Sequence, residues 1–425
     1  MNQTYLDLIE LFSAASTGRE CKLNTVNNLL DVFDLANKAN IWQCVFSAVK
    51  KMRSEGKIQI DDETFSVLDK TVLYKLAKYS AKCKNVHKVI EKLESENINV
   101  IVLKGETFSS LYANKAHRTS SDTDILIDAK DENKATKIIA DMGFEISKKS
   151  SVSHHTRCYS EKCGLIELHT DVYEDYIDSL YFDGFEIKKD NTIYVEANDG
   201  FKLKTLSYND GLYFNTFHYI KHFLTHGCGL KQVMDLNLYI SHYKNEIDFA
   251  SYIKQMEKLK FDTLIKSTLG IGIKYFGFES DALFNVEYDD NKVDALLTDI
   301  VEAGTFGNAQ KERKHFNDEF LKHLLKDDYN SYKASFNVNF FKKSASFKIN
   351  NIYSKYQYAK KNKSLIPVAY VHHIWYIISK SIKRVFTKKE KIDLEFTEKR
   401  IELMETLNIL KKDWTYMQNM FSLFN

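Results

Sequence analysis

Two aspartates two positions apart are the residues of this sequence best suited to chemistry on phosphate groups. Asp122 and Asp124 stand at the start of an apolar, β-branched run, Thr123 to Asp128, that has the composition of a strand. Alternate residues of a strand point to the same face, so both carboxylates are expected side by side. Such a pair repels unless a cation lies between its oxygens, and Mg²⁺ binds through one or two carboxylates with water and phosphate oxygens. The spacing therefore predicts a Mg²⁺ site.

A third acid is expected from a neighbouring strand. In Ile166-Glu-Leu-His169 the apolar residues alternate with Glu167 and His169, which share the other face. A carboxylate at Glu167 would let a second ion lie about 4 Å from the first, so that attacking and leaving oxygens are both held. Asp171 continues this face and is the alternative third ligand. His169 is expected to act either as an acid–base group, which its ordinary pKa allows, or as an orienting partner of Glu167.

Groups that can bind phosphate precede the acid pair. Lys104-Gly105 ends a predicted strand over 98–103 and begins a short helix over 106–112, where backbone N–H groups can receive a phosphate. Arg118 and Ser121, with Ser120, add donors directly before the aspartates. The sequence thus predicts a phosphate-binding region beside the Mg²⁺ site.

Further candidates lie on a later predicted helix and after it. His218, His222 and His226 are spaced four apart, but metal-binding helices usually add a glutamate, so a helix face lining the cleft is favoured over a zinc site. His226 is expected nearest Lys231 and Asp235. Lys231 either reaches a phosphate or pairs with Asp235 one turn on, and the ion pair is the favoured expectation.

The six cysteines form no CxxC pair, which favours reduced thiols in a cytoplasmic protein. Cys158 and Cys163 follow His154 and His155, but the spacing is poor for a zinc finger, and a pair of strands is the favoured interpretation.

Composition narrows the functional classes. Sixty basic against 58 acidic residues give a net charge of +2, so no overall field attracts nucleic acid, and a nucleic-acid partner is not expected. The first residues lack a signal pattern, and no apolar run is long enough to cross a bilayer. Lysines flank an apolar segment within 360–391, where an ordinary packed helix is favoured and contact with a membrane surface is the alternative.

The periodicity of apolar residues predicts an α+β protein in which a small mixed sheet is inserted between N-terminal and C-terminal helical domains. The expected domains are 1–95 (helical), 96–206 (strands), 207–304 (helical) and 305–425 (helical, with loops over 305–365). Strands are expected at 98–103, 123–128, 144–148, 155–160 and 164–172, with a hairpin at 191–205. A helix over 131–142 should end at Gly143, and Ser207 with Asp210 should begin the next helical domain. Later helices are expected at 234–243, 249–259, 263–270, 293–303, 367–386 and 395–420.

The motif series itself resembles a known family. Leu103-Lys-Gly105, Arg118-x-x-Ser121-Asp122-x-Asp124 and Glu167-Leu-His169 look like those of the bacterial uncharacterised nucleotidyltransferase family, a branch of the DNA polymerase β-like superfamily. Gly229-Leu-Lys231 and Met234-Asp-Leu236 are similar to its downstream helical segment. The segment 96–206 would then be the nucleotidyltransferase core.

The resemblance implies that an NTP, with ATP the first expectation, gives its nucleotidyl group to an unidentified hydroxyl acceptor and releases pyrophosphate. Asp122, Asp124 and Glu167 are the implied metal ligands, and Lys104-Gly105 occupies the place of the superfamily's Gly-Ser turn near the triphosphate. Because Lys-Gly replaces Gly-Ser at this turn, a second hypothesis stays open. The chain could be a catalytically degenerate module of the same fold that binds nucleotide or docks a partner.

Overall fold

A computed structural model describes residues 2–147, 155–172, 187–225, 227–303, 368 and 394–409. The chain divides into two compact units, Met1–Arg313 with Leu403–Ile409, and Lys314–Glu402 with Leu410–Asn425. The expected loops over 305–365 and nearly all of the basic-flanked segment over 360–391 lie outside the described residues. The four predicted domain boundaries stay a prediction, and the first unit carries the candidate site.

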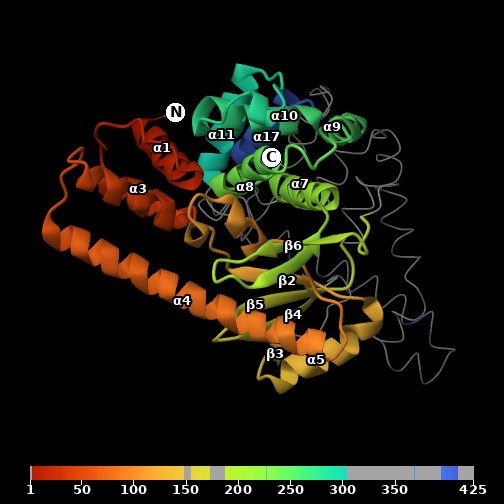
Figure 1. Cartoon of the computed structure of the whole chain (residues 1–425). Coiled ribbons are helices and arrows are strands. Elements are labelled where there is room, and N and C mark those ends of the chain that lie inside the picture. The colour runs from red at the N-terminus through yellow and green to blue at the C-terminus, as the bar shows by residue number, and fades with distance from the viewer. Residues whose placement is uncertain are drawn as a thin grey trace. The chain divides into compact units, whose positions relative to one another are not determined.

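Residues 1–95 form helices, as predicted. They are α1 (Gln3–Thr17), α2 (Leu29–Lys38), α3 (Trp42–Ser54) and the long α4 (Asp62–Ser95). Asn2 and Asp61 begin α1 and α4, because their side chains accept hydrogen bonds from the first-turn N–H groups of Tyr5 and Thr64. Figure 1 shows α4 running along the sheet.

A mixed five-stranded sheet follows, which confirms the α+β class. Its strands are β1 (Ile101–Val102), β2 (Asp122–Leu126), β3 (Glu145–Ile146), β4 (His155–Ser160) and β5 (Gly164–His169). The spatial order is β1-β2-β5-β4-β3, with β2 and β5 parallel and the other pairs antiparallel. Short helices connect the strands: η1 (Glu106–Leu111), η2 (Lys115–His117), η3 (Ala129–Asp131) and α5 (Glu132–Asp141).

One face of the sheet is apolar, and the other carries the candidate acids beside apolar residues such as Ile101 and Leu126. Ile125, Ile166 and Leu168 point into a core cluster that also contains the buried residues of α4 and α5. The alternating positions of β2 and β5 carry the candidate acids and therefore lie on the opposite face. The helix α5 ends where Gly143 takes a left-handed φ of 87°, as expected of a helix-terminating glycine.

The predicted hairpin is present as β6 (Thr192–Glu196) and β7 (Lys202–Leu206). Thr205 Oγ1 donates to the carbonyl of Val102 at 2.7 Å and holds the hairpin beside β1. Ser207 then begins α7 (Tyr208–Thr225), because its Oγ accepts from Asp210 N and donates to the Asp210 carboxylate.

Helices account for most of the remaining described chain. They are α8 (Leu230–His242), α9 (Phe249–Lys258), α10 (Asp262–Ile271), η4 (Gly272–Phe276), η5 (Asp281–Leu283), α11 (Asp290–Ala303) and α17 (Leu394–Thr406). In Figure 1, α7 and α8 lie across the sheet from α4 and α5. The face of the sheet that carries the acids therefore looks toward α7, whose Phe214 belongs to one apolar cluster with Leu126.

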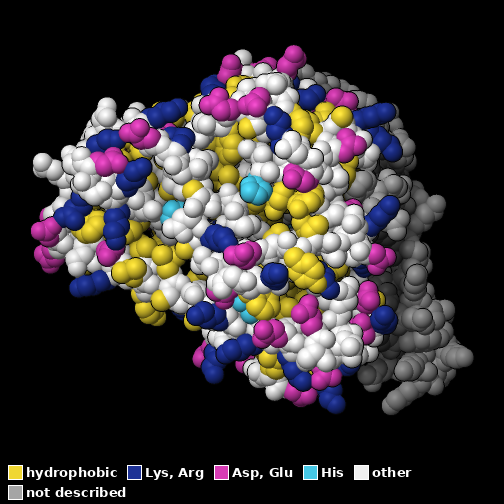
Figure 2. All heavy atoms as spheres, in the orientation of Figure 1, with side chains coloured by type: hydrophobic (Ala, Val, Ile, Leu, Met, Phe, Trp, Pro, Cys, Tyr) yellow, Lys and Arg dark blue, Asp and Glu magenta, His cyan; other side chains and the backbone are white. Residues whose placement is uncertain are grey.

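The surface shows no field of one sign on the face drawn in Figure 2, where basic and acidic side chains are interspersed. This agrees with the small net charge of the sequence. Among the described residues, no helix combines the length and the apolar character needed to cross a bilayer.

Candidate active site

The three predicted acids converge. Asp124 pairs in register with Glu167 across the parallel strands β2 and β5, and Asp122 stands two residues before Asp124 on the same face. Oxygen atoms of the three carboxylates lie within 4.8 Å of one another. That spacing suits a hard divalent cation, whose oxygen ligands surround it at 2.0–2.6 Å. The expected convergence of Asp122, Asp124 and Glu167 is therefore confirmed.

Asp124 is the most deeply buried of these acids, with 3% of its surface exposed. His169 Nε2 lies 3.1 Å from its Oδ1, while its Oδ2 accepts no hydrogen bond from any residue that the structure describes. Burial opposes ionisation, but the charge of Lys104 and the bond from His169 outweigh it and lower the pKa of Asp124 to about 2. The Lys104 ammonium lies 3.3 Å from Oδ2, so this buried anionic oxygen already faces a cation, and a metal ion there would take the place of the ammonium.

The pKa of Glu167 is shifted in the opposite direction to that of Asp124. Burial, followed by the negative charges of Asp124 and Asp122, raises the pKa of the Glu167 carboxyl. Its Oε1 lies 3.3 Å from Arg157 Nε and 3.5 Å from His155 Nε2. A cation between the three acids would remove the repulsion that raises this pKa.

Lys104 reaches directly into the acid cluster. Its Nζ lies 3.3 Å from Asp124 Oδ2, 3.9 Å from Asp122 Oδ2 and 2.9 Å from His218 Nε2. Burial works against the charge of Lys104, yet the surrounding carboxylates raise its pKa. Burial and the Lys104 charge lower the pKa of His218 well below its usual range, so the ring nitrogen is a neutral acceptor for the ammonium.

Gly105 allows the turn that brings Lys104 to this position. Its φ of 86° lies in the left-handed region, which disfavours side chains. The following η1 is a 3₁₀ helix, where the sequence predicted a short helix.

The loop over 118–121 is held by cations that bind its carbonyl oxygens. Lys82 Nζ donates to the carbonyls of Ser120 and Ser121 at 3.1 and 2.9 Å, and Lys231 Nζ donates to that of Thr119 at 3.0 Å. Ser121 Oγ lies 3.3 Å from Asp122 Oδ1, and Ser120 Oγ lies 3.1 Å from the same atom. These bonds fix the aspartate at the start of β2.

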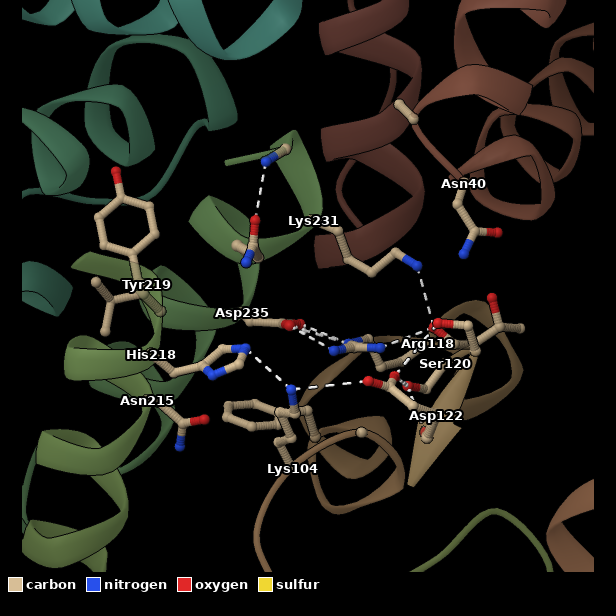
Figure 3. A pocket seen from close by; sticks show the side chains of 18 residues that line it. Asn40, Lys104, Arg118, Ser120, Asp122, Asn215, His218, Tyr219, Lys231 and Asp235 are labelled. Carbon is tan, nitrogen blue, oxygen red and sulfur yellow. Dashed lines mark hydrogen bonds and ion pairs between the residues drawn. The ribbon is translucent and has the colours of Figure 1, made fainter. Parts of the chain in front are cut away.

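The expected ion pair between Lys231 and Asp235 is wrong, because Arg118 takes the carboxylate. Arg118 Nε and Nη2 donate to both oxygens of Asp235 at 2.7–3.0 Å (Figure 3). Tyr112 Oη donates to Oδ1 of the same carboxylate at 2.8 Å. A planar guanidinium matches a carboxylate with two parallel bonds, which the Lys231 ammonium cannot make. Arg118 is therefore committed to Asp235 and, through Nη1, to the Thr119 carbonyl.

Lys231 is half-buried, and its hydrogen-bond partner is the Thr119 carbonyl. Burial and the nearby charge of Arg118 lower its pKa to about 7. Figure 3 shows Lys231 extending from its helix toward the loop that carries Ser120 and Asp122. An anion bound there would favour the charged form of Lys231.

Two cavities meet at these residues. One of about 80 Å³ is lined by the 118–122 loop, Gly105 and Lys231 (Figure 3). The other, of about 290 Å³, is lined by Asp124, Glu167 and the α7 side chains Phe214 and Phe217. Lys104, Asp122 and His218 line both, so the acid cluster stands between a basic cavity and a larger, partly aromatic one.

Three other candidates from the sequence do not belong to the acid cluster. Asp171, the alternative third ligand, is exposed beyond the end of β5, with Lys189 Nζ 3.8 Å from its Oδ1. Cys158 and Cys163 are buried free thiols, and the strand pair β4–β5 is confirmed.

The histidines of α7 face one another. His218 and His222 bring their Nε2 atoms to 2.9 Å, and His218 lines the cleft as expected of this helix face. Among the described residues, the groups with metal-ligand spacing include neither of them. His226, expected nearest Lys231, lies outside the described residues.

Two residues at the site had no place in the sequence prediction. Lys82 comes from the middle of α4, where a lysine on a long polar helix carries no signal. Tyr112, one of 25 tyrosines, was expected only as the end of a short helix.

Comparison with known proteins gives a family and several structural likenesses. A family model described as uncharacterised nucleotidyltransferase matches residues 27–277. No curated protein matches the chain.

The similar solved structures each cover half of this chain or less. They are the lincosamide antibiotic adenylyltransferase LnuA with lincomycin bound (15% identity, TM-score 0.28, 37% of this chain and 94% of that chain), the antibiotic-resistance factor ANT(2'')-Ia in solution (11%, 0.31, 46% and 97%) and an antigenic nucleotidyltransferase-like protein from Paracoccidioides brasiliensis (17%, 0.32, 50% and 96%).

Proposed function

The chain belongs to the uncharacterised nucleotidyltransferase family, and from that premise we propose that it transfers a nucleotidyl group from an NTP to a hydroxyl acceptor and releases pyrophosphate. The observation that carries the proposal is the convergence of Asp122, Asp124 and Glu167 within 4.8 Å around the buried Oδ2 of Asp124, which faces the Lys104 ammonium. Three carboxylates at such spacing between two cavities suit a reaction at phosphorus.

A divalent cation, Mg²⁺ by the hardness of its ligands, would be held by these three carboxylates, and a second ion is expected when an NTP is bound. When bound, it supplies charge neutralisation at the reacting phosphate and lowers the pKa of the acceptor hydroxyl. The residues fit such an ion because Asp124 stays ionised at neutral pH and its buried Oδ2 already faces a cation, the Lys104 ammonium, whose place a metal ion can take. His169 positions Asp124 through its bond to Oδ1 and is an orienting residue in this proposal.

The triphosphate would occupy the basic cavity. Lys231 and Ser121 line it and offer an ammonium and a hydroxyl, while Gly105 gives the backbone room to approach. Lys104 lies at the boundary of both cavities and can bridge a phosphate oxygen and the carboxylates. Arg118 is proposed to act by holding the loop, because its donors are engaged by Asp235 and Thr119. The acceptor would enter the larger cavity.

The direct test substitutes the aspartates and measures pyrophosphate release with Mg²⁺ and ATP over a panel of hydroxyl acceptors. Asp122→Asn with Asp124→Asn should abolish release while circular dichroism shows a folded protein. Asp171→Asn is the matched control, since this exposed acid lies outside the cluster, and it should keep wild-type turnover. Unchanged turnover in the double variant would rule out the mechanism.

One observation favours a second candidate, a nucleotide-binding module without catalysis. The Lys104 ammonium already lies 3.3 Å from Asp124 Oδ2, where a bound cation must displace it. Calorimetry with Mg²⁺ and ATP separates the two functions when run beside the release assay. Binding without release for every acceptor would favour the module.

A further inference from the structure

A second group of metal-ligand side chains adjoins the acid cluster. His155, Glu167 and His169 bring donor atoms within 4.8 Å of one another, and Glu167 belongs to both groups. We propose that these three residues form a second cation site, which shares Glu167 with the acid cluster and binds a transition metal ion such as Zn²⁺ through two imidazole nitrogens and one carboxylate oxygen. This site stands beside the proposed nucleotidyl transfer and does not require it.

The sheet places the donors by register. His155 and His169 are Cα partners across the antiparallel strands β4 and β5, and Glu167 is two residues before His169. All three side chains therefore project from one face, and cross-strand partners have Cβ atoms about 5 Å apart. The two imidazole rings lie with centroids 5.1 Å apart and tilted by 43°. Rigid strands thus hold two nitrogens and one carboxylate at adjacent positions.

The distances suit coordination better than hydrogen bonding. His155 Nε2 lies 3.5 Å from Glu167 Oε1, whereas an N–H···O bond is usually about 2.9–3.0 Å. In a tetrahedral site with bonds of about 2.1 Å, neighbouring ligand atoms are about 3.4 Å apart. The distance between His155 and Glu167 is close to this ligand–ligand distance, and small side-chain rotations can bring the third donor atom into place.

The donor set selects the kind of ion. Mg²⁺ prefers oxygen ligands, whereas imidazole suits zinc and the neighbouring transition metals. Three protein ligands leave coordination positions for water or substrate, as in catalytic rather than structural zinc sites. All three residues line the cavity of about 290 Å³, and their side chains are 12–19% exposed, so an ion can enter.

Arg157 is the competing cation. Its Nε lies 3.3 Å from the same Oε1 of Glu167, but its side chain is 56% exposed and can turn into solvent. His169 Nε2 also lies 3.1 Å from Asp124 Oδ1, so an ion bound through Nε2 would replace this hydrogen bond, whereas an ion bound through Nδ1 would leave it in place. The two sites together would be a pair of neighbouring cation positions with Glu167 between them, one ligated by oxygen and the other largely by nitrogen.

The test uses Co²⁺ as a spectroscopic probe on the full chain, with excess Mg²⁺ present to fill the oxygen-ligated position. The wild type should bind one Co²⁺ with the strong visible absorption of a low-coordinate site containing nitrogen. His155→Ala should lose that absorption and bind Co²⁺ about 100-fold or more weakly in equilibrium dialysis, since even indirect ligand partners are worth 10–100-fold. His242→Ala, which removes an exposed histidine at the end of α8, is the matched control and should behave as the wild type.

X-ray absorption of the Zn²⁺-loaded wild type keeps the test independent of how the variants fold. Imidazole scattering around the zinc supports the site, and a shell of oxygen alone overturns it, as does a His155→Ala variant with unchanged Co²⁺ absorption and affinity. Asp122→Asn should retain the Co²⁺ signal. A protein that shows nitrogen ligation without pyrophosphate release keeps this inference and loses the proposed function, and release without nitrogen ligation does the reverse.

Discussion

The ammonium of Lys104 lies 3.3 Å from Asp124 Oδ2, a buried oxygen that accepts no hydrogen bond within the described part of the chain. This one contact gives the ion-free protein a positive charge at the place where the proposed Mg²⁺ would lie. The lysine therefore both stabilises the acid cluster and competes with the metal.

Replacing Lys104 separates these two effects. Lys104→Met leaves crowded carboxylates without their cation, so the free energy of unfolding should fall by about 3 kcal/mol in EDTA. Mg²⁺ should restore most of that loss and should bind about tenfold more tightly than to the wild type, because no ammonium must move. Urea unfolding with and without Mg²⁺ measures both. Lys130→Met, at an exposed lysine, should change neither. Equal destabilisation with and without Mg²⁺ contradicts the competition.

The free energy of unfolding at acidic pH should depend on the ionisation of Asp124. Its pKa is about 2 in the fold against an ordinary 3.8, so the carboxylate contributes stability above 3.8 and loses it as pH falls toward 2. The contribution is about 2 kcal/mol. Urea unfolding should be measured from pH 5 downward. The difference in free energy of unfolding between the wild type and Asp124→Asn should become smaller as the pH falls. Asp171→Asn should follow the wild type, and a gap that stays constant argues against a depressed pKa.

Nucleotide binding should take up a proton through Lys231. Its pKa of about 7 means that the side chain is largely neutral near pH 8, and a triphosphate beside it would restore the charge. Calorimetry in buffers of different ionisation enthalpy should show uptake of close to one proton. Lys231→Met should abolish the uptake and weaken ATP binding about 10–100-fold, the worth of one charge-assisted bond. Lys137→Met, on the exposed face of α5, should keep the uptake; a Lys231→Met protein that also keeps it rejects this role.

Two glycines with nearly equal positive φ separate stability from function. Gly105 and Gly143 have φ of 86° and 87°, which side chains rarely adopt, so alanine at either position should destabilise the fold by about 1–3 kcal/mol. Only Gly105→Ala should also reduce nucleotide binding and turnover, because Gly105 sets the position of Lys104. Thermal unfolding and ATP calorimetry on both variants make the comparison. Equal loss of nucleotide binding and turnover in the two variants would contradict the proposal that Gly105 positions Lys104.

The sequence predicted what depends on local periodicity. The strand pattern around Asp122 and Asp124 placed both acids on one face, and alternation along β5 placed Glu167 with them. The glycine at 143 ended its helix for a reason that the sequence already contains, a backbone conformation that other residues adopt at a cost. These features could be predicted because each depends only on residues that are close in the sequence.

Contacts between distant segments could not be predicted in the same way. The local i, i+4 rule favoured Lys231 with Asp235, but Arg118 lies 117 residues away in sequence and makes the better pair. The approach of His155 to Glu167 depends on the register of two strands, which the sequence does not state. Lys82 reaches the 118–121 loop because α4 runs along the sheet, and that placement depends on tertiary packing.

The most direct test is a crystal of the full chain soaked with Mn²⁺ and an NTP analogue that cannot be cleaved at the α-phosphate. Anomalous density should lie between Asp122, Asp124 and Glu167, in contact with phosphate oxygens, with Lys104 displaced from Asp124 Oδ2 and Lys231 on the triphosphate. Density for the nucleotide away from these carboxylates, or a Lys104 ammonium still at Asp124 with no ion beside it, would contradict the account.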